Sequence, residues 1–188
     1  MKKNFNFEIT PILTLSEDNM SCTLIKIDEL NLLFDCGWDE NFNPEVPQKI
    51  LNSLKSSNSK IDYIFLSHNS ISSFGSLPIL IKDDLIKDAT IYTTTPISKL
   101  GFYSLIDALI SKIEKSEFDL FNDTEIDQVF KFCIELKYKQ NAKLHHNGFE
   151  IIITPIPSGM SLGGCAWKIF HKLKTIIYCP QICNETKK

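Results

Sequence analysis

The 188-residue sequence contains no arginine, so all 20 of its basic side chains are lysines. The planar guanidinium of arginine is the usual bidentate partner of phosphate and of guanine. Contact with RNA would therefore depend on lysine point charges, backbone amides or aromatic stacking. The 23 acidic residues give a net charge of -3, which provides no basic field to attract nucleic acid. These features count against a stand-alone RNA-binding domain, an alternative that salt-dependent RNA binding would revive.

Several targeting and redox signals are also absent. The six cysteines include no Cys-x-x-Cys pair, and the N-terminus lacks the apolar core of a secretory signal. No segment approaches the roughly 18 uninterrupted apolar residues that a membrane-spanning helix needs. We therefore expect an intracellular protein with free thiols and no membrane association.

The overall composition is that of an ordinary globular protein, with 43% hydrophobic and 23% charged residues. A chain of this length can form one domain with a substantial core, and we expect one domain over residues 1–188. Strand-rich segments flank a central part in which strands and helices alternate. This order predicts an α/β sandwich built on mixed sheets.

Hydrophobic patterns and turn residues place the expected elements along the chain. Ser72 or Ser73 is expected to cap the second helix, and Asp123 or Thr124 the fourth. Asn147-Gly148 is a hairpin signal. Helices are expected at 47–54, 73–82, 96–115 and from the fourth cap to about 133, and strands at 6–15, 22–28, 31–35, 62–66, 89–94, 133–138, 142–145, 149–154, 166–170 and 175–179.

The segment from Ile64 to Pro78 has the frame of a two-metal hydrolase loop. An apolar strand enters Ser67-His68, and Gly-x-Leu-Pro opens the helix that follows. A metal-binding loop in this frame would carry His-x-His-x-Asp-His, because zinc prefers imidazole, thiolate and carboxylate ligands. Only the first of those residues, His68, is present here.

Five segments together carry a family resemblance: Phe34 to Glu40 (the first motif), Leu66 to Pro78 (the second motif), Ala89 to Pro96 with the helix after it, Thr154 to Gly164 (the third motif) and Ile176 to Gln181. In this order they resemble the motifs of the metallo-β-lactamase family, in the RNA-processing branch whose members also carry a β-CASP domain. The resemblance implies a metallo-β-lactamase-like αβ/βα sandwich with mixed sheets, of which this chain is the N-terminal portion. The β-CASP domain and the C-terminal remainder are expected to be absent, which would leave an apolar sheet edge or face exposed.

Active members of that family hold two zinc ions that activate the attacking water. The resemblance implies that five of the six ligand positions in this chain have lost their ligand, and that Asp35, which orients a ligand in active members, orients nothing metal-bound here. We expect no catalytic residue, no bound metal and no cofactor. The six positions are His68, which is kept, Ser70, Ser72, Ser73 and Met160, which replace His, Asp, His and His, and Gln181, which replaces the bridging Asp.

The resemblance implies a non-catalytic scaffold subunit of the nuclear complex that cleaves and polyadenylates pre-mRNA. Its expected partners are a homologous, active zinc endonuclease subunit and other cleavage and polyadenylation factors, with pre-mRNA contacted through the complex. The alternative is a metal-dependent hydrolase or ribonuclease with a rebuilt site. Such an enzyme would use His68, one divalent ion and a ligand outside the family pattern.

Several residues carry two interpretations at this stage. His68 is either a lone acid or base or a hydrogen-bonded structural residue. Ser72 and Ser73 either cap a helix or lie where free backbone amides accept an anion. Trp38 and Phe42 are either exposed anchors for a partner or members of the core.

Overall fold

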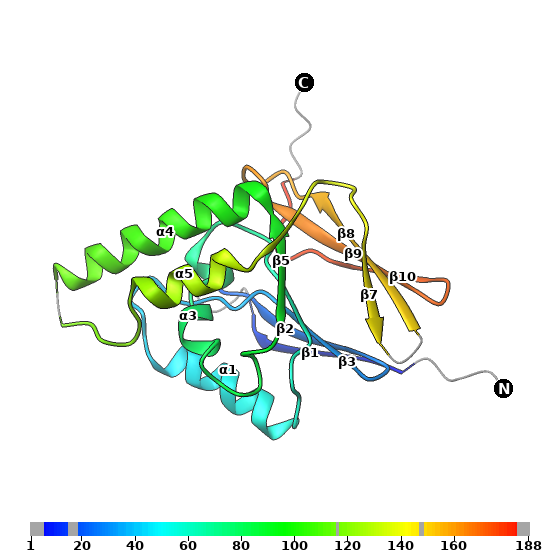
Figure 1. Ribbon diagram of the computed structural model, residues 1–188, viewed down its shortest axis with the longest axis horizontal. Coiled ribbons are helices and arrows are strands. Elements are labelled where there is room, and N and C mark those ends of the chain that lie inside the picture. Colours follow the sequence, from blue (N-terminus) through cyan, green and yellow to red (C-terminus); the bar gives the residue numbers. More distant parts are fainter. Residues whose placement is uncertain (1–5, 15–18, 116, 147–148, 184–188) are drawn as a thin grey trace.

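The computed structural model describes residues 6–14, 19–115, 117–146 and 149–183. Two sheets pack face to face, and the helices cover the outer face of the larger sheet (Figure 1). The predicted α/β sandwich with mixed sheets is confirmed. The larger sheet has the order β1-β2-β3-β4-β5-β6, with β1 (Phe7–Leu13), β2 (Cys22–Ile27), β3 (Leu30–Phe34), β4 (Tyr63–Phe65), β5 (Thr90–Thr94) and β6 (Ile134–Leu136).

The smaller sheet is antiparallel throughout, whereas the larger one is antiparallel from β1 to β3 and parallel from β3 to β6. The smaller sheet has the order β10-β9-β8-β7, with β7 (Ala142–His146), β8 (Phe149–Pro157), β9 (Cys165–His171) and β10 (Lys174–Tyr178). The helices are α1 (Glu45–Ser56), α2 (Ile71–Phe74), α3 (Leu77–Leu80), α4 (Thr95–Ile113) and α5 (Asp123–Lys131). The expected Asn147-Gly148 turn lies outside the described residues.

The core lies where aromatic side chains of the two sheets meet. The ring of Phe65 stacks on Phe34 at 4.9 Å and on Tyr92 at 5.5 Å, which joins three neighbouring strands. Across the sandwich, Trp167 of β9 meets Phe65 edge-on at 5.1 Å. Continuous apolar runs are typical of parallel strands that are buried on both faces. The apolar runs of β3 and β4 are therefore buried in the core. This packing also fixes where the loops that follow the two strands begin.

The expected helix at 73–82 is wrong. The chain forms two short helices instead, α2 and α3, which are separated at Gly75. The N-cap of α2 is Ser70 rather than Ser72 or Ser73, and its side chain makes no capping hydrogen bond. A Cβ at Gly75 would lie 2.8 Å from Trp38 Cβ, so the chain must pass close to the first-motif loop at this point. The amide of Ser76 donates to Cys36 O at 3.0 Å instead of to a helical carbonyl, and Pro78 has no N–H to donate, so tertiary packing and proline together interrupt the expected helix.

Two details of the longer helices also differ from expectation. Asn122, not Asp123 or Thr124, caps α5, and it forms a capping box with Glu125. The sequence pattern of α4 predicts roughly one apolar face, formed by Ile97, Leu100, Leu105, Leu109 and Ile113. This face is only partly buried, because Leu100 is 37% and Ile113 is 55% exposed. The buried side of α4 is formed by Ile97, Ser98, Gly101, Leu105 and Leu109.

A polar cluster ties the β2–β3 turn to the β9–β10 hairpin. Asp28 Oδ2 accepts a hydrogen bond from Lys172 Nζ at 2.6 Å and contacts His171 Nε2 at 3.1 Å. Burial alone would raise the pKa of Asp28, but hydrogen bonds from Lys172, the Asn6 amide and His171 outweigh it and lower this pKa to about 2. These contacts therefore link the two sheets at one edge of the sandwich.

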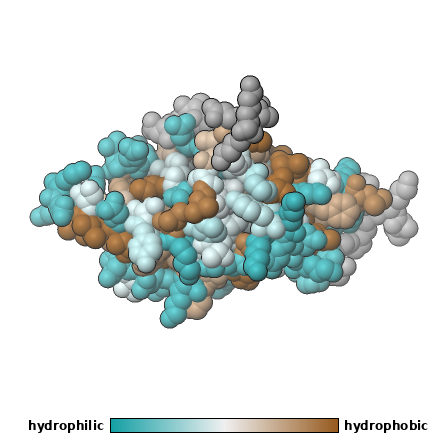
Figure 2. Space-filling view, turned by 90° about the horizontal axis from the view of Figure 1, so that it is seen from above, coloured by the Kyte–Doolittle hydropathy of each residue, from teal (hydrophilic) through white to brown (hydrophobic). Residues whose placement is uncertain are grey.

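The four-stranded sheet has β10 at one edge. β10 pairs only with β9 within the described chain; its Ile177 is 56% exposed, and Leu173, in the turn before β10, is 94% exposed. Seen from above, hydrophobic residues form separate patches among hydrophilic ones (Figure 2). Within the described part of the chain, no helix is long and apolar enough to cross a membrane.

Candidate functional site

A cleft of about 700 Å³ lies where the loops after several strands meet helix α4. Because β3, β4 and β5 are parallel, the loops at their carboxyl ends meet at one edge of the sheet. We call this hollow the motif cleft. It is lined by Asn19, Trp38, Glu40, Ser70, Ile71, Ser72, Ser104, Asp107, Ala108, Met160 and Gln181.

Backbone hydrogen bonds join the first-motif loop to the second-motif loop. The amide of Cys36 donates to Ser73 O at 2.7 Å, and the amide of Trp38 donates to Ile71 O at 3.1 Å. Between them, a Cβ at Gly37 would lie 2.0 Å from Ser72 O, so only glycine fits at this position. The positions of the second-motif serines are therefore set by the main chain of the first motif.

The structure brings four of the six ligand positions together in the motif cleft: Ser70, Ser72, Met160 and Gln181. The hydroxyls of Ser70 and Ser72 are 2.8 Å apart and hydrogen-bond to each other. Met160 is 49% exposed. The fifth position, Ser73, is buried and does not line the cleft.

The sixth position, His68, is 3% exposed, and neither of its ring nitrogens has a hydrogen-bond partner in the described chain. Burial lowers the pKa of His68, which favours the neutral imidazole. A catalytic base is normally oriented by a second group, and His68 has no such group here. Among the described residues, the hydrogen bonds expected of a structural His68 are not found.

Asp35 is fully buried and does not line the motif cleft. Its Oδ1 accepts a 2.8 Å hydrogen bond from the Ser67 amide, and its Oδ2 accepts from Tyr178 OH at 3.0 Å and from Ser21 Oγ at 3.2 Å. Burial raises the pKa of Asp35 to about 7 in spite of these bonds. Through these hydrogen bonds, Asp35 connects the second-motif loop and β10 to the end of β3.

Trp38 and Phe42 belong to the core, so their interpretation as exposed anchors is wrong. Trp38 is 1% and Phe42 is 5% exposed, and their rings meet edge-on at 5.0 Å. The indole NH of Trp38 donates to Asn43 O at 2.7 Å. Burial also raises the pKa of the neighbouring Cys36 thiol well above its usual range, so this residue is not a reactive thiolate.

The donors in the motif cleft do not fit a zinc pair. The two hydroxyls are neutral and already bond to each other, and a thioether prefers soft ions such as Cu(I). Gln181 offers a neutral carbonyl oxygen, which cannot offset two dications as a bridging carboxylate does. Among the described residues, no group of three or more His, Cys, Asp or Glu side chains is placed to hold a metal ion.

Two acidic residues of the cleft escaped prediction from sequence. Glu40 closes the first motif, and Asp107 lies on α4 one turn from Ser104. The spacing of Ser104, Asp107 and Ala108 predicts that these three residues share one face of the helix. That spacing gives no sign that the face borders a loop near residue 40.

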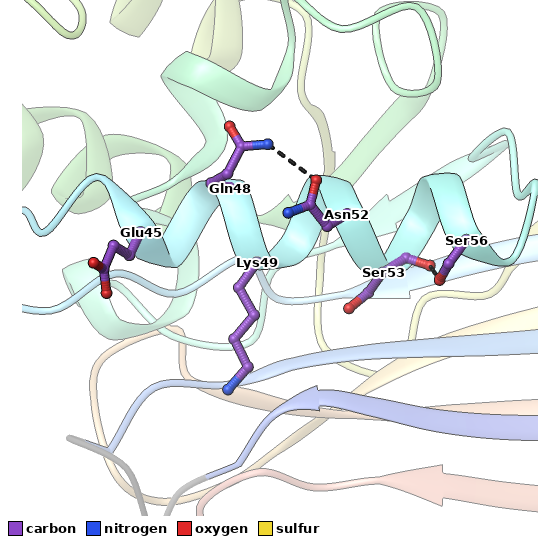
Figure 3. A pocket seen from close by; sticks show the side chains of 6 residues that line it. All are labelled: Glu45, Gln48, Lys49, Asn52, Ser53 and Ser56. Atoms are coloured by element: carbon purple, nitrogen blue, oxygen red, sulfur yellow. Dashed lines mark hydrogen bonds between the residues drawn. The ribbon is translucent and has the colours of Figure 1, made fainter.

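A second hollow lies along α1 (Figure 3). It has a volume of about 510 Å³ and is lined by polar residues of that helix alone. Gln48 Nε2 donates to Asn52 Oδ1 at 3.0 Å along the helix. Residues from a single exposed helix face do not converge on one point, so this hollow is not a candidate site.

The fold and the loop motifs define a class of protein, and sequence comparison names it. A family model described as "Metallo-beta-lactamase superfamily domain" matches residues 24–188, and the chain belongs to this family. In solved structures it is similar to a Cronobacter sakazakii metallo-beta-lactamase with a HARLDQ motif. The TM-score is 0.58 and the identity 19%, over 90% of this chain and 55% of that one, which supports the fold alone.

Among curated proteins, the chain is similar to cleavage and polyadenylation specificity factor subunit 2 of Arabidopsis thaliana. The identity is 35% over 171 residues, which cover 91% of this chain and 22% of the relative. It is 34% identical over 153 residues to the probable subunit 2 of Drosophila melanogaster, covering 81% of this chain and 20% of that protein. The chain thus spans about a fifth of the length of these relatives and corresponds to their N-terminal part.

Proposed function

We propose that this chain is the metallo-β-lactamase-like part of a non-catalytic scaffold subunit in the pre-mRNA 3′-end cleavage and polyadenylation complex. The relatives named as subunits of that factor support the complex. One observation supports the absence of catalysis: Ser70 and Ser72 hydrogen-bond to each other in a cleft that they share with Met160 and Gln181. A nuclear location follows from this proposal.

The chemistry of that cleft supports a scaffold rather than a nuclease. Metal-assisted phosphodiester hydrolysis needs ions that activate water and stabilise charge on the scissile phosphate. Neutral hydroxyl, thioether and amide donors hold hard dications weakly. Meanwhile the loops around the cleft keep their backbone connections, such as Ser21 N to Ser72 O at 3.1 Å. The fold has kept its structure where the ligand chemistry has changed.

The proposed partners are an active homologous endonuclease subunit and other cleavage and polyadenylation factors. Pre-mRNA would be contacted through the complex, because this chain lacks arginine and has a net charge of -3.

Affinity purification of the tagged full-length protein from its own cells, with and without ribonuclease, tests this assignment. We expect the homologous endonuclease subunit and the cleavage factors to co-purify in both cases, because the contacts are between proteins. A full-length variant that carries Ser70→Ala and Ser72→Ala should recover the same partners, since neither hydroxyl serves a metal. Recovery of no cleavage factor would refute the assignment.

One observation favours the alternative hydrolase: neither ring nitrogen of His68, in the loop where the family binds metal, has a partner among the described residues. Against it, His68 is buried and does not line the motif cleft. The two functions differ in metal content. Stoichiometric zinc together with phosphodiesterase activity, both lost in His68→Ala, would establish the hydrolase with a rebuilt site and exclude the scaffold proposal.

A further inference from the structure

Three buried polar side-chain atoms gather around Gly164, at the end of the third motif, and none of them has a hydrogen-bond partner in the described chain. They are His68 Nδ1, Ser158 Oγ and Ser161 Oγ. His68 is 3% and Ser158 is 2% exposed. A Cβ at Gly164 would lie 2.8 Å from Ser161 Oγ and 3.0 Å from each of the other two atoms. The three atoms therefore converge on one point, and we call them the Gly164 cluster.

The main chain around the Gly164 cluster is engaged elsewhere and does not satisfy these atoms. The Gly164 amide donates to Ser161 O at 3.0 Å, and Gly164 O accepts from the Ser158 amide and from Tyr138 OH, each at 3.0 Å. Ser158 O accepts from the Cys183 amide at 3.0 Å. Buried hydroxyl and imidazole groups are normally paired, because an unpaired one loses its hydration without compensation. The cluster therefore has hydrogen-bonding capacity for a further group.

The chemistry of the cluster selects a neutral occupant. Two of its side chains are hydroxyls, and burial lowers the pKa of His68, which favours the neutral imidazole. An ion would lose its hydration there without a countercharge among the three side chains. A metal ion is further disfavoured because, among the described residues, no group of three or more His, Cys, Asp or Glu side chains is placed to hold one.

A water molecule matches the donors and acceptors of the cluster. A neutral imidazole presents either an N–H donor or an acceptor at Nδ1, and each hydroxyl both donates and accepts. Water also donates and accepts, and a buried water typically makes about three hydrogen bonds to groups that are otherwise unpaired. Glycine at position 164 keeps a methyl group out of the space between the three atoms.

We propose that the Gly164 cluster is a binding site for one structural water molecule, which its three side chains hold jointly. The water links the second-motif loop to the third motif through side chains. The main chain already joins the two at one point, where the Cys165 amide donates to Ser67 O at 2.9 Å. The inference rests on the proposed absence of a metal ion and adds a ligand that connects these loops without one.

A high-resolution crystal structure of the full-length protein, purified without added metal, tests for the water directly. We expect one peak of water density within hydrogen-bond distance of all three cluster atoms. Direct hydrogen bonds among the three side chains, without such a peak, would overturn the inference and leave the proposed function standing. An ion at this point would also overturn the inference, and zinc, identified by its anomalous scattering, would overturn the proposed function as well.

Ser158→Ala in the full chain gives a second test, because the sign of its effect separates a hydrated hydroxyl from an unpaired one. If Ser158 Oγ bonds to the water, the substitution should lower the folding equilibrium constant about fivefold in urea denaturation. If this hydroxyl has no partner, its removal should leave that constant unchanged or raise it, and this result would refute the inference. The matched control is Ser76→Ala, whose buried Oγ donates to Gly37 O at 2.7 Å and whose loss should lower the constant by a similar factor.

Discussion

Replacing Asp35 with asparagine should remove a large part of the pH dependence of stability. The carboxyl is fully buried, and burial raises its pKa from the ordinary value of 3.8 to about 7. The native state therefore holds this proton more tightly than the unfolded state does. Since the folded state binds more protons between pH 4 and 7, the free energy of unfolding falls as the pH rises through that range.

The size of the effect follows from the shift. Each pKa unit corresponds to about 1.4 kcal/mol, so the wild type should lose about 3 kcal/mol of stability between pH 5 and pH 8 on account of Asp35. The substituted asparagine side chain would carry no charge at either pH. Its amide oxygen can still accept from the Ser67 amide, so Asp35→Asn should gain about 3 kcal/mol relative to wild type over the same interval.

Urea denaturation at several pH values, under reducing conditions, measures this difference. The fluorescence of the buried Trp38 and Trp167 reports unfolding. Asp119→Asn serves as the control, because Asp119 is exposed. Parallel stability curves for wild type and Asp35→Asn between pH 5 and pH 8 would refute the argument that the buried carboxyl dominates this dependence.

Four further changes test the fold around the site by denaturation. Gly37→Ala should cost about 3 kcal/mol or more, because its Cβ would lie 2.0 Å from Ser72 O; an unchanged midpoint would contradict this. Leu173→Gly should stabilise by about 1 kcal/mol, since Leu173 is exposed and has a φ of 68°; a loss of stability would count against it. Asn122→Ala should cost about 1 kcal/mol through the lost cap of α5, measured against Asn122→Asp. Asp28→Asn should flatten the loss of stability between pH 4 and pH 2, because its lowered pKa stabilises the fold only while the carboxylate is ionised; an unaltered acid limb would refute that role.

The sequence was sufficient to predict the sandwich because its central strands are continuous apolar runs. Leu32, Leu33 and Phe34 are all fully buried, as such a run in a parallel strand requires. The break between α2 and α3 had a local signal, because Pro78 lies inside the expected helix and has no N–H to donate to the carbonyl four residues earlier. The expected cap of α5, Asp123 or Thr124, was one or two residues too late, although the spacing of Asn122 and Glu125 matches a capping box.

The candidate site was only partly visible in the sequence. Motif order predicted that Ser70, Ser72, Met160 and Gln181 belong together, and they line one cleft. The acidic contribution of Asp107 was not predictable, because no local signal shows which loop a helix face will border. The unpaired state of His68 also depends on neighbours far away in the chain, such as Gly164.

The metal content of the purified full-length protein tests the central claim most directly. The protein would be isolated in zinc-supplemented buffer beside an active member of the superfamily, and zinc would be measured by mass spectrometry. We predict substoichiometric zinc that does not change in His68→Ala, because the hydroxyl, thioether and amide donors of the motif cleft do not hold zinc. Stoichiometric zinc in the wild type that is lost in His68→Ala would contradict the account.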